Sequence, residues 1–558
     1  MNMRRFLCYL TGGALLLFLV TFLIGPIYAV AAGGLNPGLI AEIFRSPVYV
    51  EGLRNALGVA AVTTLLTLAI ALPLALLYNR FEFRGKTLST VAIMAPMILP
   101  PFVGALGFQQ LLGYYGVFNS LLAGLGFARI DFLGGDGKFW AICAIEALHL
   151  YPILYLNLIT ALANIDPAYQ EAARNLGAGA WRRFFRITLP LVKPGIFAGG
   201  SIVLIWSFTE LGTPLMFNYT RITPVQVFNG ITELERNQLP LALVVIMLAV
   251  SALLYLTGKL AFGRPAAGGA AGKGATGGGG IQLGFLAGLL PAGAFALITI
   301  LALLPHISLV LIAFSRSWYN SALPESLTWL NFDAALSDSL VVPSIVNSLR
   351  YSLSAMVIAV AAGVLVSLAV VRWKLRGGWL LDTLAMLPLA VPGIVMAFGF
   401  LVLAYANGFT RMLFDVEKNP LLLLAVAYAV RRLPYVVRAV SSGLEQTPAE
   451  LENAGRNLGA GAWCVLRRIT LPLVAANILV GALFAFSFSM LEVSDSLILA
   501  QKTQFYPITK AIYELSSILG EGRYIACAFG VWAMLFLAST LGLAAAALGK
   551  KIGAIFRL

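Results

Sequence analysis

The chain has 558 residues, of which 60% are hydrophobic and only 11% are charged. Soluble domains are about half apolar and about a quarter charged, so this composition excludes an ordinary soluble protein and is typical of one that crosses a membrane many times. A net charge of +14 could indicate binding to nucleic acid. The basic residues, however, are concentrated in alternate loops, which is the pattern of the cytoplasmic loops of membrane proteins. We therefore expect no nucleic-acid partner.

A helix that spans a bilayer needs about 20 mostly apolar residues. None of the apolar stretches alternates like a barrel strand, so we predict an all-α polytopic protein embedded in the lipid bilayer. The basic loops put both termini in the cytoplasm, and the first stretch reads as an uncleaved span. Pro96, Pro100, Pro388 and Pro392 predict kinks in the third and ninth spans. The twelve stretches lie near 7–31, 53–78, 88–113, 139–163, 195–218, 239–262, 284–314, 349–371, 381–407, 420–443, 475–500 and 523–549.

The chain consists of two copies of one unit. RFEFRGK at 80–86 is repeated as RWKLRGG at 372–378, and LGAGAW at 176–181 recurs at 458–463. Each copy has six predicted spans, so the copies have parallel topology and would enclose a path along the membrane normal. The predicted domains are a first unit at 1–263, a flexible Gly/Ala-rich cytoplasmic linker at 264–280 and a second unit at 281–558.

A polar, basic loop follows the fourth span of each copy, at 166–195 and at 447–476. Residues with N-cap, first-turn and C-terminal preferences predict a short helix in each loop. We expect Pro190, Pro194 and Pro472 to break the segment that follows. The helix signals are Asp166, Pro167 and Gly177 in the first copy and Thr447, Pro448, Glu450 and Gly459 in the second.

These loops allow two interpretations from the residues alone. A short helix with a small Ala/Gly face suits docking into the groove of a partner. The basic residues also suit an amphipathic segment that lies on anionic lipid. Because the same glycine and proline spacing occurs twice, docking is the favoured interpretation.

The first loop resembles the EAA signature of ABC importer permeases, E-A-A-x3-G-x9-I-x-L-P. The match consists of Glu171-Ala172-Ala173, then Gly177, then Ile187-Thr188-Leu189-Pro190. The six-span unit, present twice, extends the similarity across nearly the whole chain. In the second loop Gly459, Ile469, Leu471 and Pro472 match at the same spacing.

The second loop departs from the signature at its acidic residue. The triplet reads Asn453-Ala454-Gly455, and Glu452 lies one place earlier. A slip of one residue turns a side chain by about 100° on a helix. We therefore expect Glu452 to act differently from Glu171 and the two docking sites to be unequal.

The resemblance implies the function of a transport subunit. In that family the EAA helix sits in a cleft of a separate cytoplasmic ATPase dimer, whose closure turns the pore outward to receive substrate from a periplasmic binding protein. The permease itself catalyses no reaction and needs no cofactor, and it lies in the bacterial inner membrane. The coupling residues implied are Glu171, Ala172, Ala173, Arg174 and Gly177, with Glu452, Ala454, Arg456 and Gly459.

Carboxylates inside the predicted spans are candidates for the transport pathway. Glu210 and Glu492 occupy equivalent places in the fifth span of each copy. Asp495 shares a helix face with Glu492 because the two are three residues apart. The alternative is that these acids are polar contacts between helices or lie near a water-facing end.

The fourth spans carry a second set of polar residues. Glu146 and His149 are three residues apart in the first copy, where the second copy has Arg431 and Arg432. A salt bridge or gate contact is the favoured interpretation over a metal site, since the chain has only two histidines and no metal-ligand spacing. We predict no metal site.

The substrate is the least determined feature. Two permease units fused in one chain resemble ferric-iron importer permeases, while thiamine permeases share the format and polyamine and aminoethylphosphonate importers are related. The intramembrane carboxylates suit a cation, which favours ferric iron, thiamine or polyamine. Two rivals remain: an ion-coupled secondary transporter, which would not need two docking helices, and a non-transporting scaffold, which has no use for paired intramembrane carboxylates.

Overall fold

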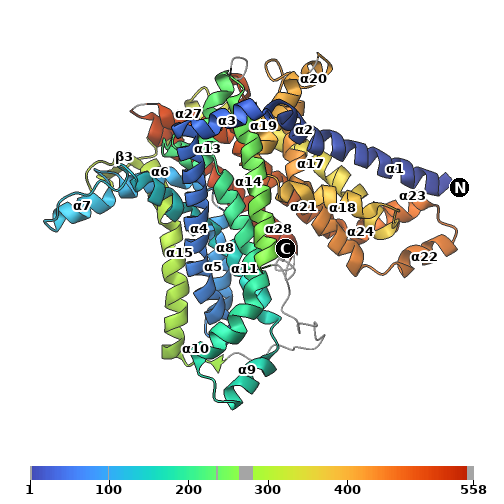
Figure 1. Cartoon of the computed structure of the whole chain (residues 1–558), viewed down its shortest axis with the longest axis horizontal. Coiled ribbons are helices and arrows are strands. Elements are labelled where there is room, and N and C mark those ends of the chain that lie inside the picture. Colours follow the sequence, from blue (N-terminus) through green and yellow to red (C-terminus); the bar gives the residue numbers. More distant parts are fainter. Residues whose placement is uncertain are drawn as a thin grey trace. The chain divides into compact units, whose positions relative to one another are not determined.

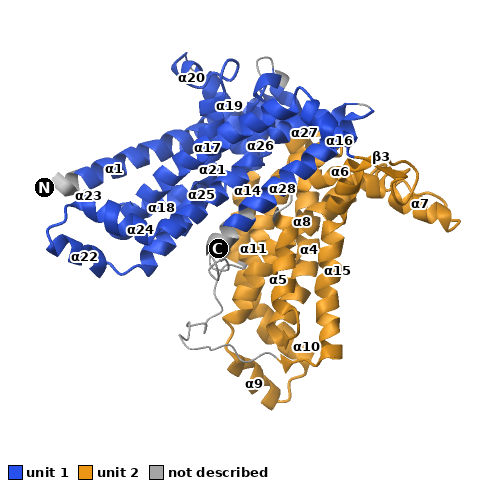
Figure 2. Cartoon of the chain, turned by 180° about the vertical axis from the view of Figure 1, so that it is seen from behind, with its two compact units in different colours: residues 1–46, 226–248, 329–555 blue, residues 47–225, 249–328, 556–558 orange. Residues whose placement is uncertain are grey.

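The computed structural model describes residues 3–98, 100–233, 237–262, 281–406, 408–518 and 520–548, which form two compact units (Figure 2). Unit 1 contains Met1–Ser46, Gln226–Leu248 and Trp329–Ile555. Unit 2 contains Pro47–Val225 and Ala249–Thr328. Each unit therefore combines segments from both sequence repeats. The predicted linker at 264–280 lies outside the described residues.

Unit 2 is built around three mutually packed helices (Figure 1): α4 (Pro47–Arg80), α8 (Gly137–Ala163) and α11 (Leu189–Thr209). A fourth long helix, α15 (Phe285–Ala313), packs on α5 (Lys86–Ile98) and α6 (Pro101–Leu112). The core gathers on α8, where Tyr151 and Tyr155 are fully buried. The ring of Tyr155 meets that of Phe295 on α15, with centroids 6.2 Å apart.

Unit 1 repeats this plan with the corresponding helices. Its central helices are α17 (Val341–Ser367), α21 (Leu421–Gln446) and α25 (Ala475–Met490). The chain's first helices, α1 (Met3–Leu19) and α2 (Gly25–Gly34), pack on α18 (Gly378–Met386) and α19 (Gly393–Tyr405), respectively. The last helix, α28 (Gly522–Leu548), packs on α25 and on α27 (Ile508–Ser517).

One further helix, α14 (Leu239–Phe262), is long and apolar enough to cross a membrane, and the remaining helices are short or connect the long ones. They are α3 (Pro37–Arg45), α7 (Val117–Gly124), α9 (Pro167–Asn175), α10 (Ala180–Arg183), α12 (Gly212–Met216), α13 (Thr223–Asn229), α16 (Leu330–Ser337), α20 (Gly408–Leu413), α22 (Glu450–Asn457), α23 (Ala462–Val465), α24 (Leu471–Leu473) and α26 (Ser494–Leu499). Single π turns are η1 (Val20–Ile24), η2 (Phe184–Thr188), η4 (Leu368–Arg372) and η6 (Leu466–Thr470), and 3-10 turns are η3 (Gly230–Glu233), η5 (Leu387–Leu389) and η7 (Thr503–Phe505).

Four short strands in the described part of the chain complete an otherwise all-α fold, as predicted. β1 (Phe81–Glu82) pairs in parallel with β2 (Ile281–Gln282). β3 (Ser315–Ser317) pairs in antiparallel with β4 (Ser326–Leu327). Strands this short hold loops in place and do not form a core.

The first helix of each repeat packs on helices of the other repeat, which explains why both units contain segments from both halves of the sequence. In unit 2, α15 of the second repeat approaches α6 so closely that a Cβ on Gly107 would lie 1.8 Å from the carbonyl oxygen of Pro305. In unit 1, a Cβ on Gly399 of α19 would lie 2.5 Å from the carbonyl oxygen of Pro26 on α2. Gly107 and Gly399 are equivalent positions of the repeat, so one close helix contact is made twice. Small residues commonly permit such contacts between membrane helices.

The predicted spans correspond to helices of the structure. Within the described ranges, eight helices are long and apolar enough to cross a membrane, or up to eleven if each of three bent pairs is one span. The predicted kinks are confirmed, since the helix runs break after Ile98 and at Pro392, where the two halves of the ninth span meet at 105°. The tenth predicted span is α21, whose three arginines make it too charged to be counted by composition.

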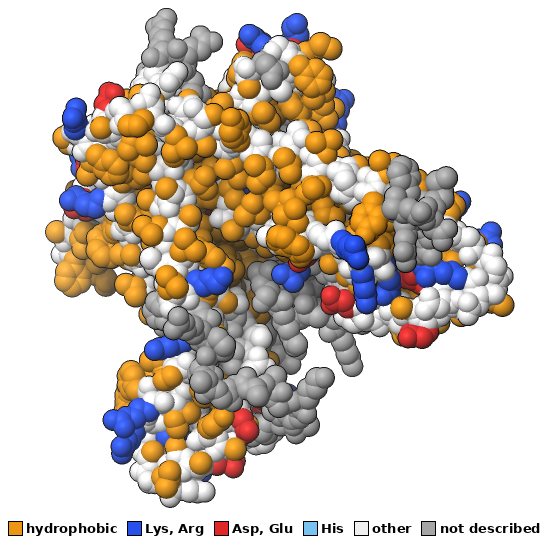
Figure 3. All heavy atoms as spheres, turned by 45° about the vertical axis from the view of Figure 1, so that its right-hand side comes forward, with side chains coloured by type: hydrophobic (Ala, Val, Ile, Leu, Met, Phe, Trp, Pro, Cys, Tyr) orange, Lys and Arg blue, Asp and Glu red, His pale blue; other side chains and the backbone are white. Residues whose placement is uncertain are grey.

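The surface of the molecule is consistent with a membrane environment. Figure 3 shows hydrophobic side chains over most of the visible face and charged side chains mainly at its margins. Exposed apolar residues of this kind are the expected lipid-facing surface of a polytopic protein.

The close helix contacts predict the effect of adding one methyl group. Replacing Gly107 or Gly399 by Ala should destabilise the detergent-solubilised protein by about 1–3 kcal/mol, because backbone and not a flexible side chain must move. Unfolding can be followed with a thiol-reactive dye, since Cys143 and Cys527 are buried in the folded chain.

Gly293→Ala on α15 is the matched control, because nothing lies within 4 Å of its added Cβ. This variant should be neutral or slightly stabilising. Equal melting temperatures for all three variants would contradict the close contacts.

Candidate functional site

The loop of the first repeat contains a short exposed helix with well-formed ends. Asp166 caps α9 by accepting a hydrogen bond from the Ala168 backbone N–H at 2.9 Å, as predicted. At the other end Gly177 has a φ of +77°. The N–H of Gly177 donates to the carbonyl of Arg174 at 3.0 Å, and that of Ala178 donates to Ala173 at 2.9 Å. This pair of bonds is a Schellman motif, which requires a left-handed residue and so favours glycine.

The loop of the second repeat ends its helix in the same way. Gly459 has a φ of +86°, and its N–H donates to the carbonyl of Arg456 at 2.9 Å. The Ala460 N–H donates to Gly455 at 3.1 Å. The predicted end of the helix is therefore confirmed in both repeats, and the two turns share one backbone geometry.

The start of the second helix was predicted wrongly. α22 begins at Glu450, after a helical Ala449 that makes no side-chain cap. Thr447 instead donates its hydroxyl proton to the carbonyl of Gly443 in the last turn of α21, at 2.8 Å. The hydroxyl is therefore used to end one helix and does not begin the next.

The prediction that prolines interrupt the following segment is confirmed in one repeat only. α11 begins at Leu189 and continues through Pro194, which lies inside the helix. Pro190 lies in the first turn of α11, where a missing N–H is tolerated. In the second repeat the chain bends by 70° between Ala462–Leu473 and Ala475–Met490. A π turn precedes both segments, η2 in the first repeat and η6 in the second.

The turn of each loop presents a large apolar residue to its surroundings. Leu176 is 88% exposed and Leu458 is 89% exposed, and both occupy the C-cap position before the left-handed glycine. Trp181 and Trp463 are also exposed. The coupling residues singled out from the sequence did not include these leucines, although the repeated LGAGAW contains both.

The predicted coupling residues differ in how far they are exposed to solvent. In α9, Glu171, Ala172, Arg174 and Gly177 are exposed, while Ala173 is half-buried. In α22, Ala454 and Gly459 are exposed and Arg456 is half-buried. A Cβ at Gly455, which replaces Ala173 of the first repeat, would come within 2.5 Å of the side-chain end of Ile469, so this part of the second helix packs closely on the segment that follows it.

Glu452 faces inward, unlike Glu171. Its carboxylate accepts a hydrogen bond from Arg372 Nε at 2.7 Å, and Arg372 also donates to the Thr447 carbonyl at 2.8 Å. Arg372 closes η4 at the end of α17, so Glu452 ties the loop helix to a spanning helix. The equivalent residue of the first repeat is Gln170, which donates to Thr188 at 2.9 Å.

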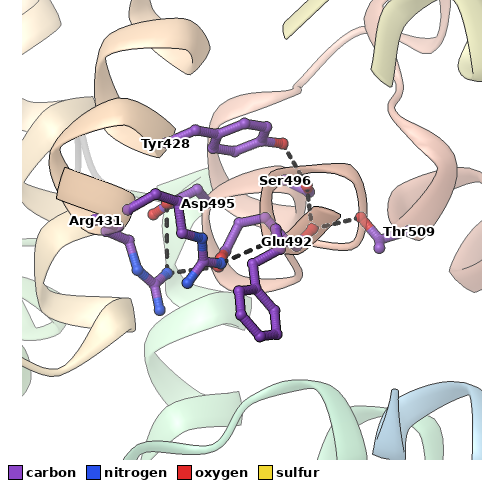
Figure 4. Close-up of polar contacts among 8 residues, drawn as sticks. Tyr428, Arg431, Glu492, Asp495, Ser496 and Thr509 are labelled. Atoms are coloured by element: carbon purple, nitrogen blue, oxygen red, sulfur yellow. Dashed lines mark hydrogen bonds and ion pairs between the residues drawn. The ribbon is translucent and has the colours of Figure 1, made fainter. Parts of the chain in front are cut away.

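The predicted intramembrane acids of unit 1 are ion-paired (Figure 4). Arg431 Nη1 lies 2.5 Å from Glu492 Oε1 and 3.4 Å from Asp495 Oδ2. Arg432 forms a further ion pair with Glu492. Glu492 is only 5% exposed and Asp495 is fully buried. A buried carboxylate requires such partners, since an unpaired charge in an apolar interior is very costly.

Neutral hydrogen bonds extend this cluster, as Figure 4 shows. Tyr428 and Ser496 share a hydrogen bond of 2.6 Å between their hydroxyls. Thr509 donates to the backbone carbonyl of Glu492 at 2.7 Å, which connects α27 to the cluster. The geometry favours the second interpretation of these acids, as contacts between helices, and a pathway role for Glu492 or Asp495 stays a prediction.

The corresponding polar residues of unit 2 are arranged differently. Glu210 follows the last residue of α11, and its carboxylate accepts a hydrogen bond from the Thr213 N–H at 3.3 Å. His149 Nδ1 lies 2.8 Å from the Pro96 carbonyl. Glu146 is buried, and neither of its carboxylate oxygens has a hydrogen-bond partner. The salt bridge suggested for Glu146 and His149 is therefore wrong.

No group of three or more His, Cys, Asp or Glu side chains that could hold a metal ion occurs among the described residues. The four cysteines, Cys8, Cys143, Cys464 and Cys527, are free thiols.

Two repeats of one helical unit, each with an exposed loop helix of the same geometry, define a membrane permease built from two homologous halves. Residues 67–263 and 355–550 each match the family described as binding-protein-dependent transport system inner membrane component, and the chain belongs to this family. It is thus a multi-pass inner-membrane subunit of a binding-protein-dependent ABC importer, and not an enzyme. The family is one without cofactors.

Relatives with different stated substrates are similar to the chain. The Fe(3+)-transport system permease protein FbpB 2 of Haemophilus influenzae is 24% identical over 482 residues, 85% of this chain and 86% of that one. The ferric transport system permease protein FbpB of Actinobacillus pleuropneumoniae is 26% identical over 471 residues, 82% of this chain and 65% of that one. The molybdenum transport system permease protein ModB of Haemophilus influenzae is 31% identical over 218 residues, 37% of this chain and 90% of that one.

The buried ion pairs predict a large loss of stability when one partner is removed. Glu492→Gln should lower the free energy of unfolding by about 3–5 kcal/mol, because two guanidinium groups lose their shared carboxylate. The measurement is thermal unfolding of the detergent-solubilised chain, and Glu325→Gln, at an exposed carboxylate, is the control. Glu492→Gln with the melting temperature of the wild type would show that the cluster does not stabilise the fold.

Proposed function

We propose that this importer subunit passes ferric iron from a periplasmic binding protein to the cytoplasm, driven by a separate ATPase dimer. The observation that supports iron best is the length of the similarity. The two ferric permeases align with 82% and 85% of the chain, through both repeats, whereas the molybdenum permease aligns with 37%.

The two loop helices are the proposed contacts with the ATPase. Each lies at one end of the helix bundle of its own unit (Figure 1), and each presents an exposed leucine at its turn. Apolar residues on an exposed turn suit insertion into a partner's cleft. The chain needs two such loops because the motor has two subunits and each repeat is moved by one of them. Alternating access then follows from rocking one repeat against the other.

The contacts of the two loops with the ATPase are proposed to be unequal. The first loop offers the exposed Glu171, and the equivalent position of the second loop is the exposed and uncharged Asn453. Glu452 is occupied by Arg372 and holds its helix to α17. In this proposal the second loop docks through Ala454, Gly459 and Leu458, without a carboxylate.

Thiamine, polyamine and aminoethylphosphonate remain alternative substrates, because permeases of these importers share the fused format or are related to it. An ion-coupled secondary transporter is a weaker alternative, since the family of this chain depends on a binding protein.

Uptake of radioactive ferric iron tests this proposal. Cells would express the chain with its own binding protein and ATPase, and unlabelled thiamine, putrescine and aminoethylphosphonate would be added as competitors. The double variant Gly177→Asp, Gly459→Asp should abolish uptake, because a charged side chain then occupies both docking turns.

Gly126→Asp is a close control for the double variant. Gly126 also has a positive φ, of +84°, and nothing lies within 4 Å of its added Cβ, as at Gly177 and Gly459. Backbone strain is therefore similar and only the location differs. Uptake that is equally reduced in the control would argue against docking at the loops, and absence of iron uptake by a well-assembled wild type would overturn the substrate.

The different directions of Glu452 and Glu171 predict opposite phenotypes. Glu452→Gln should destabilise the isolated chain by about 1–3 kcal/mol, because the largely buried guanidinium of Arg372 loses its charged partner. Glu171→Gln should change stability by less than about 0.5 kcal/mol, as exposed substitutions do, and should instead weaken copurification of the ATPase.

Thermal unfolding and pull-down of the ATPase separate the two effects. Arg372→Gln should reproduce the loss of stability of Glu452→Gln, and the double variant should be little worse than either single one. Additive losses would show that Arg372 and Glu452 do not act as a pair.

A further inference from the structure

One carboxylate of unit 2 is buried without any partner. Glu146 on α8 is only 2% exposed, and both of its oxygens lack a hydrogen bond. The hydroxyls of Ser207 on α11 and Thr213 on α12 are also buried, and neither makes a well-formed hydrogen bond. A charge that is left alone in an apolar interior is strongly unfavourable, so this carboxylate requires a positive ion or a proton beside it.

A second carboxylate lies close to the first. Glu210 follows α11 and is near enough to Glu146 for the two charges to repel each other, and Ser207 also lies beside Glu146. Glu146 thus has Ser207 and the charge of Glu210 in its neighbourhood, and Glu210 in turn accepts a hydrogen bond from the backbone of Thr213. The bundle of α4, α8 and α11 holds this region together, since each of these helices packs on the other two.

The second repeat shows how the same scaffold neutralises its acids. Glu492 occupies the position of Glu210, and the positions of His149 and Leu150 are taken by Arg431 and Arg432, which form ion pairs with Glu492. Tyr428 takes the position of Glu146. The second repeat thus supplies two arginines for its acids, Glu492 and Asp495, whereas the first repeat has His149 and Leu150 at the positions of those arginines.

We propose that Glu146 and Glu210, with the hydroxyls of Ser207 and Thr213, bind a hard, oxygen-seeking metal cation within the first repeat. This inference rests on the proposed function in one respect, that the importer carries a cation of this class. Carboxylate and hydroxyl oxygens are the donors such cations prefer. With two carboxylates the site binds weakly, as a transit site must, because the ion has to leave again.

Binding of terbium(III), a trivalent oxygen-seeking ion, to the purified full-length chain tests the site by equilibrium dialysis. Wild type should bind one more ion than Glu146→Gln, or bind it at least about tenfold more tightly, since loss even of an outer partner of a metal site costs roughly 10- to 100-fold. Glu325→Gln removes an exposed carboxylate of the same unit and should bind as the wild type does.

A second variant tests the site even if Glu146→Gln fails to fold. His149→Arg places in the first repeat the cation that the second repeat has at this position, and it should abolish terbium binding by occupying the acids. Melting temperature and copurification of the ATPase report whether each variant is folded. Wild-type affinity in both folded variants would overturn the proposal.

The outcomes also separate this site from the proposed function. Terbium binding that depends on Glu146, in a chain that imports no iron, supports the site and overturns iron as the substrate. Iron uptake by a wild type that binds no terbium overturns the site and leaves the function intact. Iron uptake that is unchanged in Glu146→Gln, together with lost terbium binding, shows a cation site outside the transport path.

Discussion

A charge inside a membrane helix bundle must be neutralised by a group within reach, and this constraint organises both units. α21 carries Arg431 and Arg432 in its buried middle part, and this part can be buried because both arginines form ion pairs with Glu492 and Arg431 also pairs with Asp495. The ion pairs connect α21 to the segment around α26, and Thr509 adds α27 through the backbone of Glu492. Partners of this kind determine which helices become neighbours, since apolar faces alone do not distinguish helix from helix in lipid.

The two repeats use one backbone plan with different side-chain chemistry. The close glycine contacts at Gly107 and Gly399 and the left-handed turns at Gly177 and Gly459 are the same in both. The polar residues differ, since Arg372 anchors the second loop through Glu452 while Gln170 anchors the first through Thr188. The two repeats therefore share their close helix contacts and loop turns, and they differ in the side chains that hold each loop to its unit.

The predictions from the sequence were correct for features that depend only on residues close together in the chain. The cap at Asp166 and the turn at Gly177 depend on residues within one helix turn, and the repeat allowed the second turn to be predicted from the first. It failed where a residue has a choice of partners. Thr447 could begin one helix or end another, and Pro194 could break a helix or be accommodated in it. The exchange of first helices and the pairing of Arg372 with Glu452 join residues far apart in the chain, which no local pattern encodes.

The anchoring of the loops suggests how movement passes from the surface to the spans. A helix that contacts a motor transmits force only if its far side is held, and hydrogen bonds to charged groups are stronger than neutral ones. Arg372 connects α22 both to Glu452 and to the Thr447 carbonyl at the end of α21, so this loop is held to two spanning helices at once. The first loop has a single neutral bond from Gln170 at the corresponding position and carries its charge, Glu171, on the outer face. In the proposed coupling, the second loop is therefore the one held more firmly to its own unit, and the first is the one that offers a carboxylate to the ATPase.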